Sequence, residues 1–375
     1  MRRGRAYYIV ARYKFLLGSR RAGCYEKDMD ELIRQLEDGR EMSACEVKLA
    51  AEFLLDAAVA DERKARLLEA MSVKGETAAE IAAFVEEFLR HAVDPGLASL
   101  DLPGPTLDVC GTGGDKLDLF NVSTTSMFVA AAAGAVVVKH GNRGITSKSG
   151  GADVLEALGV RIDLPPDEFR RCVEKAGVGF MFAPNYHPAF KAVVGVRKML
   201  AARGVRTIFN LIGPLLNPAK PQCQLVGVFS RELCPVFAEI LERLGRESAW
   251  VVNGATADGR AVDELSLMGT TRVCVTGGKR SRSDAEWSPR DFGMEPVGVE
   301  LLQGGSAAEN AVMLQEILAG KDPGPRTEMV VLNAAAGIAC AGIAGSMSEG
   351  IEIAREMIRS GGAMERLERL REASR

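Results

Sequence analysis

The chain has 375 residues, of which 47% are hydrophobic and 26% are charged. This composition is that of an ordinary globular protein and excludes large-scale disorder, and the length predicts two domains or one large α/β domain with an accessory piece. The net charge of -3 supplies no overall positive field, so we expect no nucleic-acid partner and only a local site for anions.

Cysteine and histidine usage argues against disulfides and zinc. The eight cysteines include no Cys-x-x-Cys pair, and a chain of this length does not depend on disulfides, so we expect buried thiols in a reducing cytoplasm. The three histidines show no paired spacing, and a structural zinc site is not expected. The longest apolar run, 127–138, is too short to cross a bilayer, so we expect no membrane span.

The N-terminal residues 1–28 hold eight basic side chains. No uninterrupted apolar segment follows these charges, so they do not form a secretory signal. We expect a basic N-terminal extension that is loosely ordered, or that lies upstream of a true start at Met29.

The next segment, 29–97, is predicted to be a small helical domain because its apolar side chains recur at helical spacing. Ser43 followed by Glu46 is typical of a capping box that opens a helix, and Thr77 followed by Glu80 repeats the pattern.

Residues 98–375 are predicted to form an α/β domain with a mainly parallel central sheet. Short β-rich runs alternate there with amphipathic segments such as 232–244, and that alternation is typical of such sheets. The β-rich runs are 107–109, 136–138, 178–180, 225–228 and 250–252. The segment 277–291 is interpreted as a surface turn.

Two of these runs lead into loops suited to an anion. Gly111-Thr112-Gly113-Gly114-Asp115, with Asn121-Val122-Ser123-Thr124 beyond it, follows the first run, and Lys139-His140-Gly141-Asn142-Arg143 follows the second. Glycines let main-chain N–H groups approach a ligand closely, and Lys and Arg add positive charge. Because loops after parallel strands gather at one edge of a sheet, we expect one site for a phosphate or pyrophosphate ester.

Each motif also has a plainer interpretation. Glycine-rich turns after strands are common, and 121–124 could act only as a helix N-cap. The segment 139–149 could be a polar surface loop, and His140 could be a structural histidine. A buried strand that delivers so many polar groups at its end favours binding.

Asp263 and Glu264 follow the last β-rich run, with Asp258 nearby. Adjacent acids are usually only solvated, but a pyrophosphate site needs Mg²⁺, and carboxylates are suitable ligands for that ion. Arg197 lies on a helical run, where arginine most often only covers the surface. From spacing alone, Arg197 has no special role.

Further motifs complete a fixed order along the chain. They are Ala152-Asp153-Val154-Leu155-Glu156-Ala157-Leu158-Gly159, Phe182-Ala183-Pro184 with His187-Pro188-Ala189, Arg206-Thr207-Ile208-Phe209-Asn210 with Gly213-Pro214-Leu215-Leu216-Asn217-Pro218, and Asp263-Glu264-Leu265-Ser266. Together with the loops above, they resemble the anthranilate phosphoribosyltransferase family from about Met29 to the C-terminus.

The resemblance implies transfer of phosphoribose from phosphoribosyl pyrophosphate to the amine of anthranilate, in tryptophan biosynthesis, with Mg²⁺ as cofactor. It implies a nucleoside phosphorylase/phosphoribosyltransferase-like fold, in which helices around 186–215 complete the small helical domain and the active site lies at the hinge to the α/β domain. A cytoplasmic homodimer formed through the helical domains is also implied.

The resemblance assigns roles to particular residues. Those expected to bind phosphoribosyl pyrophosphate are Gly111, Gly114, Asp115, Asn121, Ser123, Thr124, Lys139, Gly141, Asn142, Arg143, Ser147 and Gly151. Those expected to contact anthranilate are Gly111, Asn142, His187, Arg197, Gly213 and Pro214, with Arg197 positioned for the carboxylate. Ser123, Asp263 and Glu264 are expected to serve Mg²⁺. Lys139, His140 and Asn142 are expected to take part in catalysis.

The sequence departs from the family pattern at several positions. Lys116 and Leu119 stand where Gly and Thr are more frequent, Gly144 and Gly151 replace frequent serines, and Ala201-Ala202-Arg203 resembles an insertion. These differences bear on a few phosphate contacts and on the hinge or the outer anthranilate pocket.

Two alternative functions remain. A pyrimidine nucleoside phosphorylase belongs to the same superfamily, but Asp263 and Glu264 argue against it because phosphorolysis has no pyrophosphate to deliver with Mg²⁺. A non-catalytic relative that binds nucleic acid would need a basic surface, which the net charge of -3 disfavours.

Overall fold

The computed structural model describes residues 22–114, 117–144, 148–277 and 282–375. Most of the expected N-terminal extension therefore lies outside the described residues, although helix α2 begins at Ala22. The chain divides into two compact units. The first comprises the described part of Met1–Glu80 together with Lys191–Ile208, and the second comprises Ile81–Phe190 and Phe209–Arg375.

The first unit is helical. Its helices are α2 (Ala22–Glu37), α3 (Ala44–Leu55), α4 (Asp61–Lys74) and α10 (Val194–Ala202). Helix α4 packs against the other three. The capping box predicted at the start of α3 is confirmed, because the Ser43 hydroxyl accepts the N–H of Glu46 while the Glu46 carboxylate accepts the N–H of Ser43.

A buried carboxylate ties three segments of this unit together. Glu80 accepts hydrogen bonds from the main-chain N–H groups of Met42 at 2.8 Å and Thr77 at 2.9 Å, and from Lys74 Nζ at 2.7 Å. The Thr77 hydroxyl accepts the N–H of Glu80 in return, which confirms the second predicted capping box at the start of α5 (Ala78–Arg90). The Lys74 and Glu80 side chains are only 4% and 1% exposed, so neither charge has water as a substitute partner.

The second unit is built on one eight-stranded sheet with the order β3-β2-β1-β4-β5-β7-β8, in which β6 pairs with β5. The strands are β1 (Thr106–Gly111), β2 (Val136–Gly141), β3 (Val178–Phe182), β4 (Cys223–Gly227), β5 (Ser248–Ala255), β6 (Ala261–Val262), β7 (Thr271–Thr276) and β8 (Ser283–Trp287). Strands β1 to β5 are mutually parallel, which confirms the five predicted strands and the parallel sheet. Strands β6, β7 and β8 pair antiparallel.

The prediction of a surface turn over 277–291 is wrong for its described part. Strand β8 lies inside that segment and pairs with β7, and Trp287 at its end packs edge-on against Trp250 of β5. The polar residues Ser283, Asp284 and Glu286 hide this strand in the sequence, because an edge strand with charged side chains lacks the apolar pattern of the central strands.

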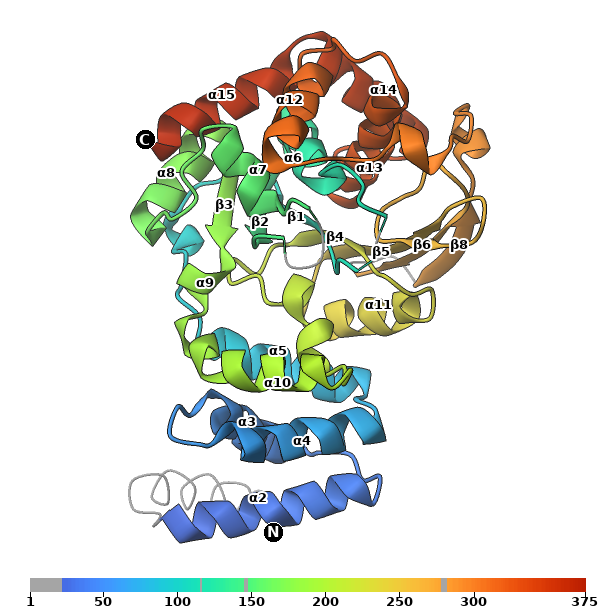
Figure 1. The fold of residues 1–375 in the computed structure, drawn as a ribbon. Coiled ribbons are helices and arrows are strands. Elements are labelled where there is room, and N and C mark those ends of the chain that lie inside the picture. The colour runs from blue at the N-terminus through green and yellow to red at the C-terminus, as the bar shows by residue number, and fades with distance from the viewer. Residues whose placement is uncertain (1–21, 115–116, 145–147, 278–281) are drawn as a thin grey trace, which may run out of the picture. The chain divides into compact units, whose positions relative to one another are not determined.

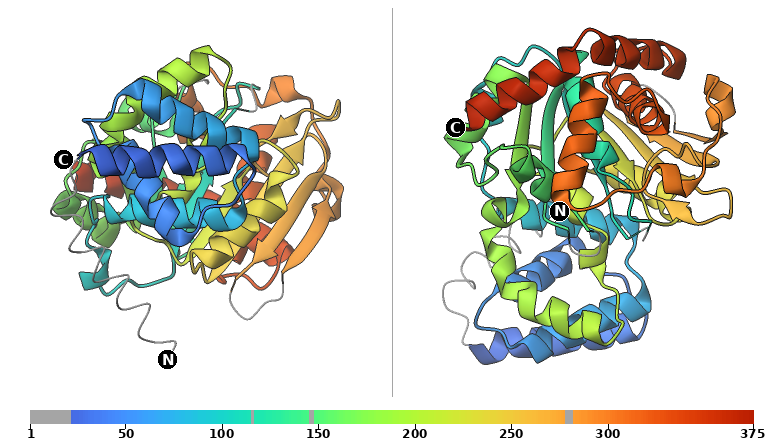
Figure 2. Two further views of the ribbon diagram at one scale, coloured as in Figure 1. Left: turned by 90° about the horizontal axis from the view of Figure 1, so that it is seen from below. Right: turned by 45° about the horizontal axis from the view of Figure 1, so that its top comes forward.

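Helices cover both faces of this sheet. They are α6 (Val122–Ala132), α7 (Gly151–Ala157), α8 (Pro166–Ala176), α9 (Ala183–Tyr186), α11 (Leu233–Arg243), α12 (Ala307–Leu318), α13 (Pro325–Cys340), α14 (Met347–Arg359) and α15 (Gly362–Ser374). Short 3-10 helices are η1 (Leu97–Ser99), η2 (Pro188–Val193), η3 (Ile208–Asn210), η4 (Gly213–Leu215), η5 (Pro289–Phe292) and η6 (Val299–Leu301). Helices α6 and α13 lie on one face and α11 on the other (Figure 1). Helix α11, predicted over 232–244, packs against β5 and β7, beside the antiparallel edge seen in Figure 2.

The core of the second unit explains why α13 and α6 are apolar on all sides. Helix α13 is buried from Met329 to Cys340 and packs against α6, α14, β4 and β5. A helix that is enclosed all round needs no polar face. The tight packing of these helices holds β1 and β4 rigidly beside each other.

The strand order reverses between β1 and β4. From β1 the chain proceeds outward through β2 and β3, and it then returns to the other side of β1 for β4 and β5. Loops that leave neighbouring parallel strands in opposite directions open a crevice at their carboxyl ends, which is the usual ligand site of such sheets. The topology therefore predicts a ligand site after β1 and β4.

Of the eight cysteines, the seven whose side chains the structure describes are free, and all of these but Cys45 are buried. The expectation of buried thiols is thus confirmed for six of them and wrong for Cys45. None of the described helices is both long enough and apolar enough to span a membrane.

We expect Glu80→Gln to lower the free energy of unfolding of the first unit by about 3 kcal/mol, because it leaves the Lys74 charge buried without its partner. Chemical denaturation followed by circular dichroism measures this change. Glu62→Gln, at an exposed position of α4, is the matched control and should change stability by less than about 0.5 kcal/mol. Equal stability of the two variants would contradict the role of the ion pair.

Candidate active site

The carboxyl ends of β1 and β4 meet at a pair of glycines. Gly111 and Gly227 are register partners, and the main chain of Asp263 passes directly over Gly227. A Cβ atom added to Gly227 would lie 1.5 Å from the Asp263 carbonyl oxygen, and one added to Gly111 would lie 2.5 Å from Asp263 Oδ2. Only glycine fits at Gly227, and at Gly111 a larger residue would displace the Asp263 side chain. The Asp263 carboxylate then accepts the N–H of Gly113 at 2.6 Å.

The start of α6 connects the acidic pair to β2. Glu264 Oε1 accepts the N–H of Ser123 at 3.1 Å, and Lys139 Nζ lies 3.3 Å from the Ser123 hydroxyl oxygen. The Lys139 ammonium also donates to the carbonyl of Val109 in β1. Three segments that are far apart in the sequence therefore bring a serine hydroxyl, a carboxylate and an ammonium group together.

The first glycine-rich region and the loop after β2 are joined at a second point. Asn121 Nδ2 donates to the carbonyl of Ser149 at 3.1 Å, and Asn310 Nδ2 donates to Asn121 Oδ1 at 2.8 Å. Asn121 occupies the N-cap position of α6 without a side-chain capping bond, so the plain N-cap interpretation of 121–124 does not describe its side chain. Gly151 and Thr124 lie close together, because a Cβ added to Gly151 would lie 3.1 Å from the Thr124 hydroxyl oxygen.

A buried polar network, missed in the sequence, surrounds Lys139. Asp108 in β1 is fully buried, and its Oδ2 accepts from Asn217 Nδ2 at 2.9 Å and from Gln224 Nε2 at 3.4 Å. Gln224 Oε1 accepts in turn from Arg246 Nε at 3.0 Å. Burial raises the pKa of Asp108 and the charge of Lys139 opposes that increase, while burial lowers the pKa of Arg246 to about 10. An acid inside an otherwise apolar strand was the signal that could have revealed this network.

Two histidines form an aromatic pair beside η4. The ring centroids of His140 and His187 are 5.1 Å apart, His187 Nε2 lies 2.9 Å from the Leu216 carbonyl oxygen, and the main chain of Gly213 hydrogen-bonds to His140. Burial, reinforced by His187, lowers the pKa of His140 to about 3, and burial also lowers the pKa of His187. Both imidazoles are therefore neutral at pH 7. Among the described residues, His140 Nε2 and His187 Nδ1 have no hydrogen-bond partner.

Family models match most of the chain. Residues 30–92 match the helical bundle domain of the glycosyl transferase family, and residues 103–364 match the a/b domain of that family. The chain is 44% identical to the anthranilate phosphoribosyltransferase of Rubrobacter xylanophilus over 92% of its own length and 97% of the relative's. It is 42% identical to that of Haloferax volcanii, over 92% and 100% of the two lengths.

The chain belongs to the anthranilate phosphoribosyltransferase family.

Solved structures agree with this assignment. The crystal structure of the Thermus thermophilus anthranilate phosphoribosyltransferase matches with a TM-score of 0.82 at 40% identity, covering 91% of this chain and 98% of that one. The Saccharomyces cerevisiae enzyme in complex with PRPP and Mg matches with a TM-score of 0.81 at 27% identity, covering 93% and 98%. The sequence resemblance and the fold class inferred from it are thus confirmed.

The acidic pair fits the Mg²⁺ ion of the family. Asp263 and Glu264 are half-buried. Glu264 accepts the main-chain N–H of Ser123, whose hydroxyl is the third expected ligand. Within the described parts of the chain, no group of three or more His, Cys, Asp or Glu side chains could hold a metal ion by itself. Mg²⁺ is commonly held by one or two carboxylates together with substrate phosphates, so this donor set suits an ion that arrives with a diphosphate.

The structure brings many of the predicted site residues to one edge of the sheet. They are Gly111, Asn121, Ser123, Thr124, Lys139, Gly141, Gly151, Asp263 and Glu264. Asp115 and Ser147 lie outside the described residues, as does Lys116. Arg197 belongs to the first unit, where it is exposed on α10, and its contact with anthranilate stays a prediction.

We expect acid to destabilise the second unit partly through His140. The folded-state pKa of about 3 lies below the ordinary value of 6.5, so between these values the unfolded chain binds a proton that the folded chain does not. The stability that neutral His140 contributes is therefore complete above pH 6.5 and falls as the pH is lowered towards 3.

Calorimetry between pH 7.5 and 5 checks this prediction, because His140→Gln should show a shallower loss of melting temperature with acid than the parent. The exposed His91, replaced in the same way, is the control and should keep the parental slope. A parental slope in His140→Gln would show that His140 is not the group responsible.

Proposed function

We propose that the residues gathered around Lys139 and Asp263 carry out the reaction of the family. This reaction transfers the phosphoribosyl group of phosphoribosyl pyrophosphate to the amine of anthranilate and yields N-(5-phosphoribosyl)-anthranilate and pyrophosphate, in tryptophan biosynthesis. The observation that carries the proposal is the hydrogen bonding of the two acids to amides of the segment after β1, Asp263 to Gly113 in the glycine-rich loop and Glu264 to Ser123 in the first turn of α6.

Stabilisation of the leaving group is the main task of these residues. Cleavage of the ribose C1–oxygen bond leaves positive charge on the sugar and builds negative charge on the departing pyrophosphate. Lys139 is 4% exposed and is held by Val109 and Ser123, so its positive charge is fixed before substrate arrives. Mg²⁺ bound by Ser123, Asp263 and Glu264 would supply further positive charge near the departing pyrophosphate.

The hydrogen bonds between the two acids and the amides can be replaced by contacts of the acids with the metal and of the amides with phosphate. When the Asp263 carboxylate turns from the N–H of Gly113 to a metal ion, that N–H becomes available to a phosphate oxygen. Glu264 and the N–H of Ser123 stand in the same relation. Binding of the metal and of the diphosphate is therefore expected to be cooperative, because each makes ligands available to the other.

The attacking amine needs orientation more than it needs a base. An aromatic amine keeps its lone pair at neutral pH, and His140, with its pKa of about 3, is a weak proton acceptor. We therefore assign His140 and His187 to the wall of the anthranilate pocket, with Gly213 and Pro214, and give the orienting role to Asn142 and Arg197. A cytoplasmic homodimer formed through the helical domain completes the proposal, on the basis of the family resemblance.

The direct test is an assay for N-(5-phosphoribosyl)-anthranilate with both substrates and Mg²⁺, and we expect product only when the metal is present. Asp263→Asn should raise the Mg²⁺ concentration needed for half-maximal rate by about tenfold or more, because it removes one of the two carboxylates. Asp258→Asn is the control, since Asp258 is bound to Arg260 and Thr256 instead. No product from the parent protein at saturating substrates and Mg²⁺ would end the proposal.

Arg197→Ala should weaken anthranilate binding by about 1.5–3 kcal/mol, the range for a hydrogen bond to a charged group, while the KM for phosphoribosyl pyrophosphate stays near the parental value. Lys198→Ala removes a neighbouring exposed charge from α10 and should leave both KM values unchanged. Steady-state kinetics with each substrate varied in turn decides the point. Selective loss of affinity for phosphoribosyl pyrophosphate in Arg197→Ala would mean that the assigned role is wrong.

A further inference from the structure

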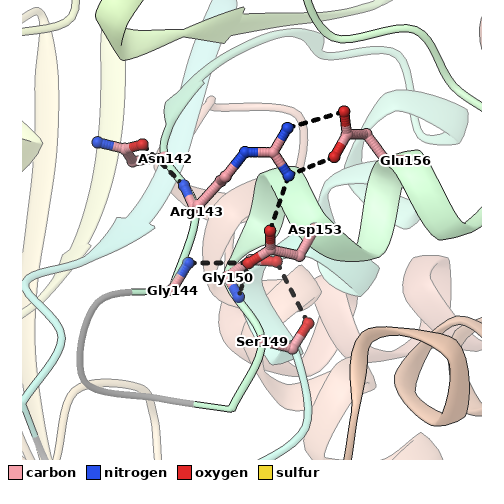
Figure 3. Close-up of polar contacts among 7 residues, drawn as sticks. All are labelled: Asn142, Arg143, Gly144, Ser149, Gly150, Asp153 and Glu156. Atoms are coloured by element: carbon pink, nitrogen blue, oxygen red, sulfur yellow. Dashed lines mark hydrogen bonds and ion pairs between the residues drawn. The ribbon is translucent and has the colours of Figure 1, made fainter.

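The loop between β2 and α7 is closed at its base by one carboxylate, that of Asp153. Its Oδ2 accepts the main-chain N–H groups of Gly144 and Gly150, each at 2.9 Å, from the two ends of the loop (Figure 3). Asp153 is the third residue of α7, so its own position is set by that helix. One side chain on a regular element thus joins two main-chain segments that six residue positions separate.

The same carboxylate takes part in an ion-pair cluster with Arg143. Arg143 Nη1 lies 3.1 Å from Asp153 Oδ1, and the guanidinium also contacts both carboxylate oxygens of Glu156, with Nη2 and Oε1 2.9 Å apart. Figure 3 shows the guanidinium turned towards α7, between these two acids. The charge of Arg143 is therefore balanced within the loop and the helix that follows it.

Two hydrogen bonds at the loop base hold Asn142. Its carbonyl accepts the N–H of Ala152 at 3.2 Å, and its side-chain Oδ1 accepts the N–H of Arg143 at 2.8 Å. A Cβ added to Gly150 would lie 2.3 Å from the nitrogen of Gly144, so the main chains at the two ends of the loop are in direct contact. Because Oδ1 of Asn142 is used in this way, its Nδ2 is directed away from the ion-pair cluster (Figure 3).

We propose that Asp153 is a positioning residue for the transfer reaction, which closes the loop base and thereby orients Asn142 for both substrates, and that Arg143 serves this closure instead of binding diphosphate. This inference rests on the proposed function, together with the expectation from the family resemblance that Asn142 contacts both substrates. Asp153 itself touches no substrate in this account. Its effect is exerted through the N–H groups of Gly144 and Gly150.

Three variants separate the parts of this arrangement. Asp153→Ala removes both acceptors and the ion pair, whereas Asp153→Asn keeps one oxygen that can accept the two N–H groups but loses the negative charge. Glu156→Gln is the matched control, because Glu156 lies one helical turn further along α7 and contacts the same guanidinium but no main-chain N–H in the described part of the loop. Each variant is made in the full-length chain.

Kinetics with each substrate varied in turn give the first readout. We expect Asp153→Ala to raise the KM for phosphoribosyl pyrophosphate at least tenfold and to lower kcat, Asp153→Asn to recover much of that loss, and Glu156→Gln to stay within about twofold of the parent. Isothermal titration of phosphoribosyl pyrophosphate with Mg²⁺ should show the same ranking without turnover. The melting temperature of each variant is measured alongside, and a functional loss at parental stability identifies positioning.

Trypsin gives a second readout that does not depend on catalysis. It cleaves after Arg143 and Lys148, which are both exposed. Arg143 directly precedes Gly144, and Lys148 lies two residues before Gly150. Cleavage at these two bonds should be faster in Asp153→Ala than in the parent and in Glu156→Gln. Should Asp153→Ala not fold, Asp153→Asn provides the same comparison with a smaller expected difference.

The outcomes distinguish this inference from the proposed function. A parent enzyme without product refutes the function itself. An active parent with parental KM, kcat and cleavage rates in Asp153→Ala overturns only the positioning role of Asp153. Loss of affinity for phosphoribosyl pyrophosphate in Arg143→Ala with parental cleavage at Lys148 would show that Arg143 binds the diphosphate, and would overturn the assignment of Arg143 to the loop closure.

Discussion

The close approach of the Asp263 main chain to Gly227 is the constraint on which the candidate site depends. In a parallel sheet, a residue at the carboxyl end of a strand normally directs its side chain into the crevice, and here the side chain has to be absent. With glycine on both β1 and β4, the segment after β6 can lie across the strand ends. Its two acids then reach the amides of Gly113, in the loop after β1, and of Ser123, in the first turn of α6.

The candidate site places an enclosed cation, Lys139, beside a neutral imidazole, His140. Lys139 is enclosed and remains beside Asp108, whose own charge is supported by Asn217 and, through Gln224, by Arg246. The neighbouring His140, by contrast, is held neutral by burial. The result is a permanent cation for a leaving diphosphate next to a surface without charge for an aromatic ring, and this combination matches the two substrates of the family.

The sequence predicted the parallel half of the sheet and both capping boxes correctly, because those features follow from local patterns. The β-rich runs are predominantly apolar, and Ser43 and Thr77 each stand three residues before a glutamate. Strand β8 was missed because its residues are polar and its place is defined only by pairing with β7. Likewise, the loops after β1 and β2 could be predicted to bind an anion from their glycines and basic residues, but the contact between Lys139 and Ser123 depends on how β2 and α6 pack.

Arg143 illustrates the limit of reading roles from residue type. Within a run of Lys, His, Asn and Arg after a strand, the guanidinium appeared suited to phosphate, and the resemblance supported that role. Asp153 and Glu156, three residues apart on α7, both contact it, because helical spacing presents both carboxylates on one side. That spacing was present in the sequence and would have predicted an intramolecular partner. A cation near a substrate loop therefore identifies a ligand only after the acids of the following helix have been considered, since those acids are always within reach.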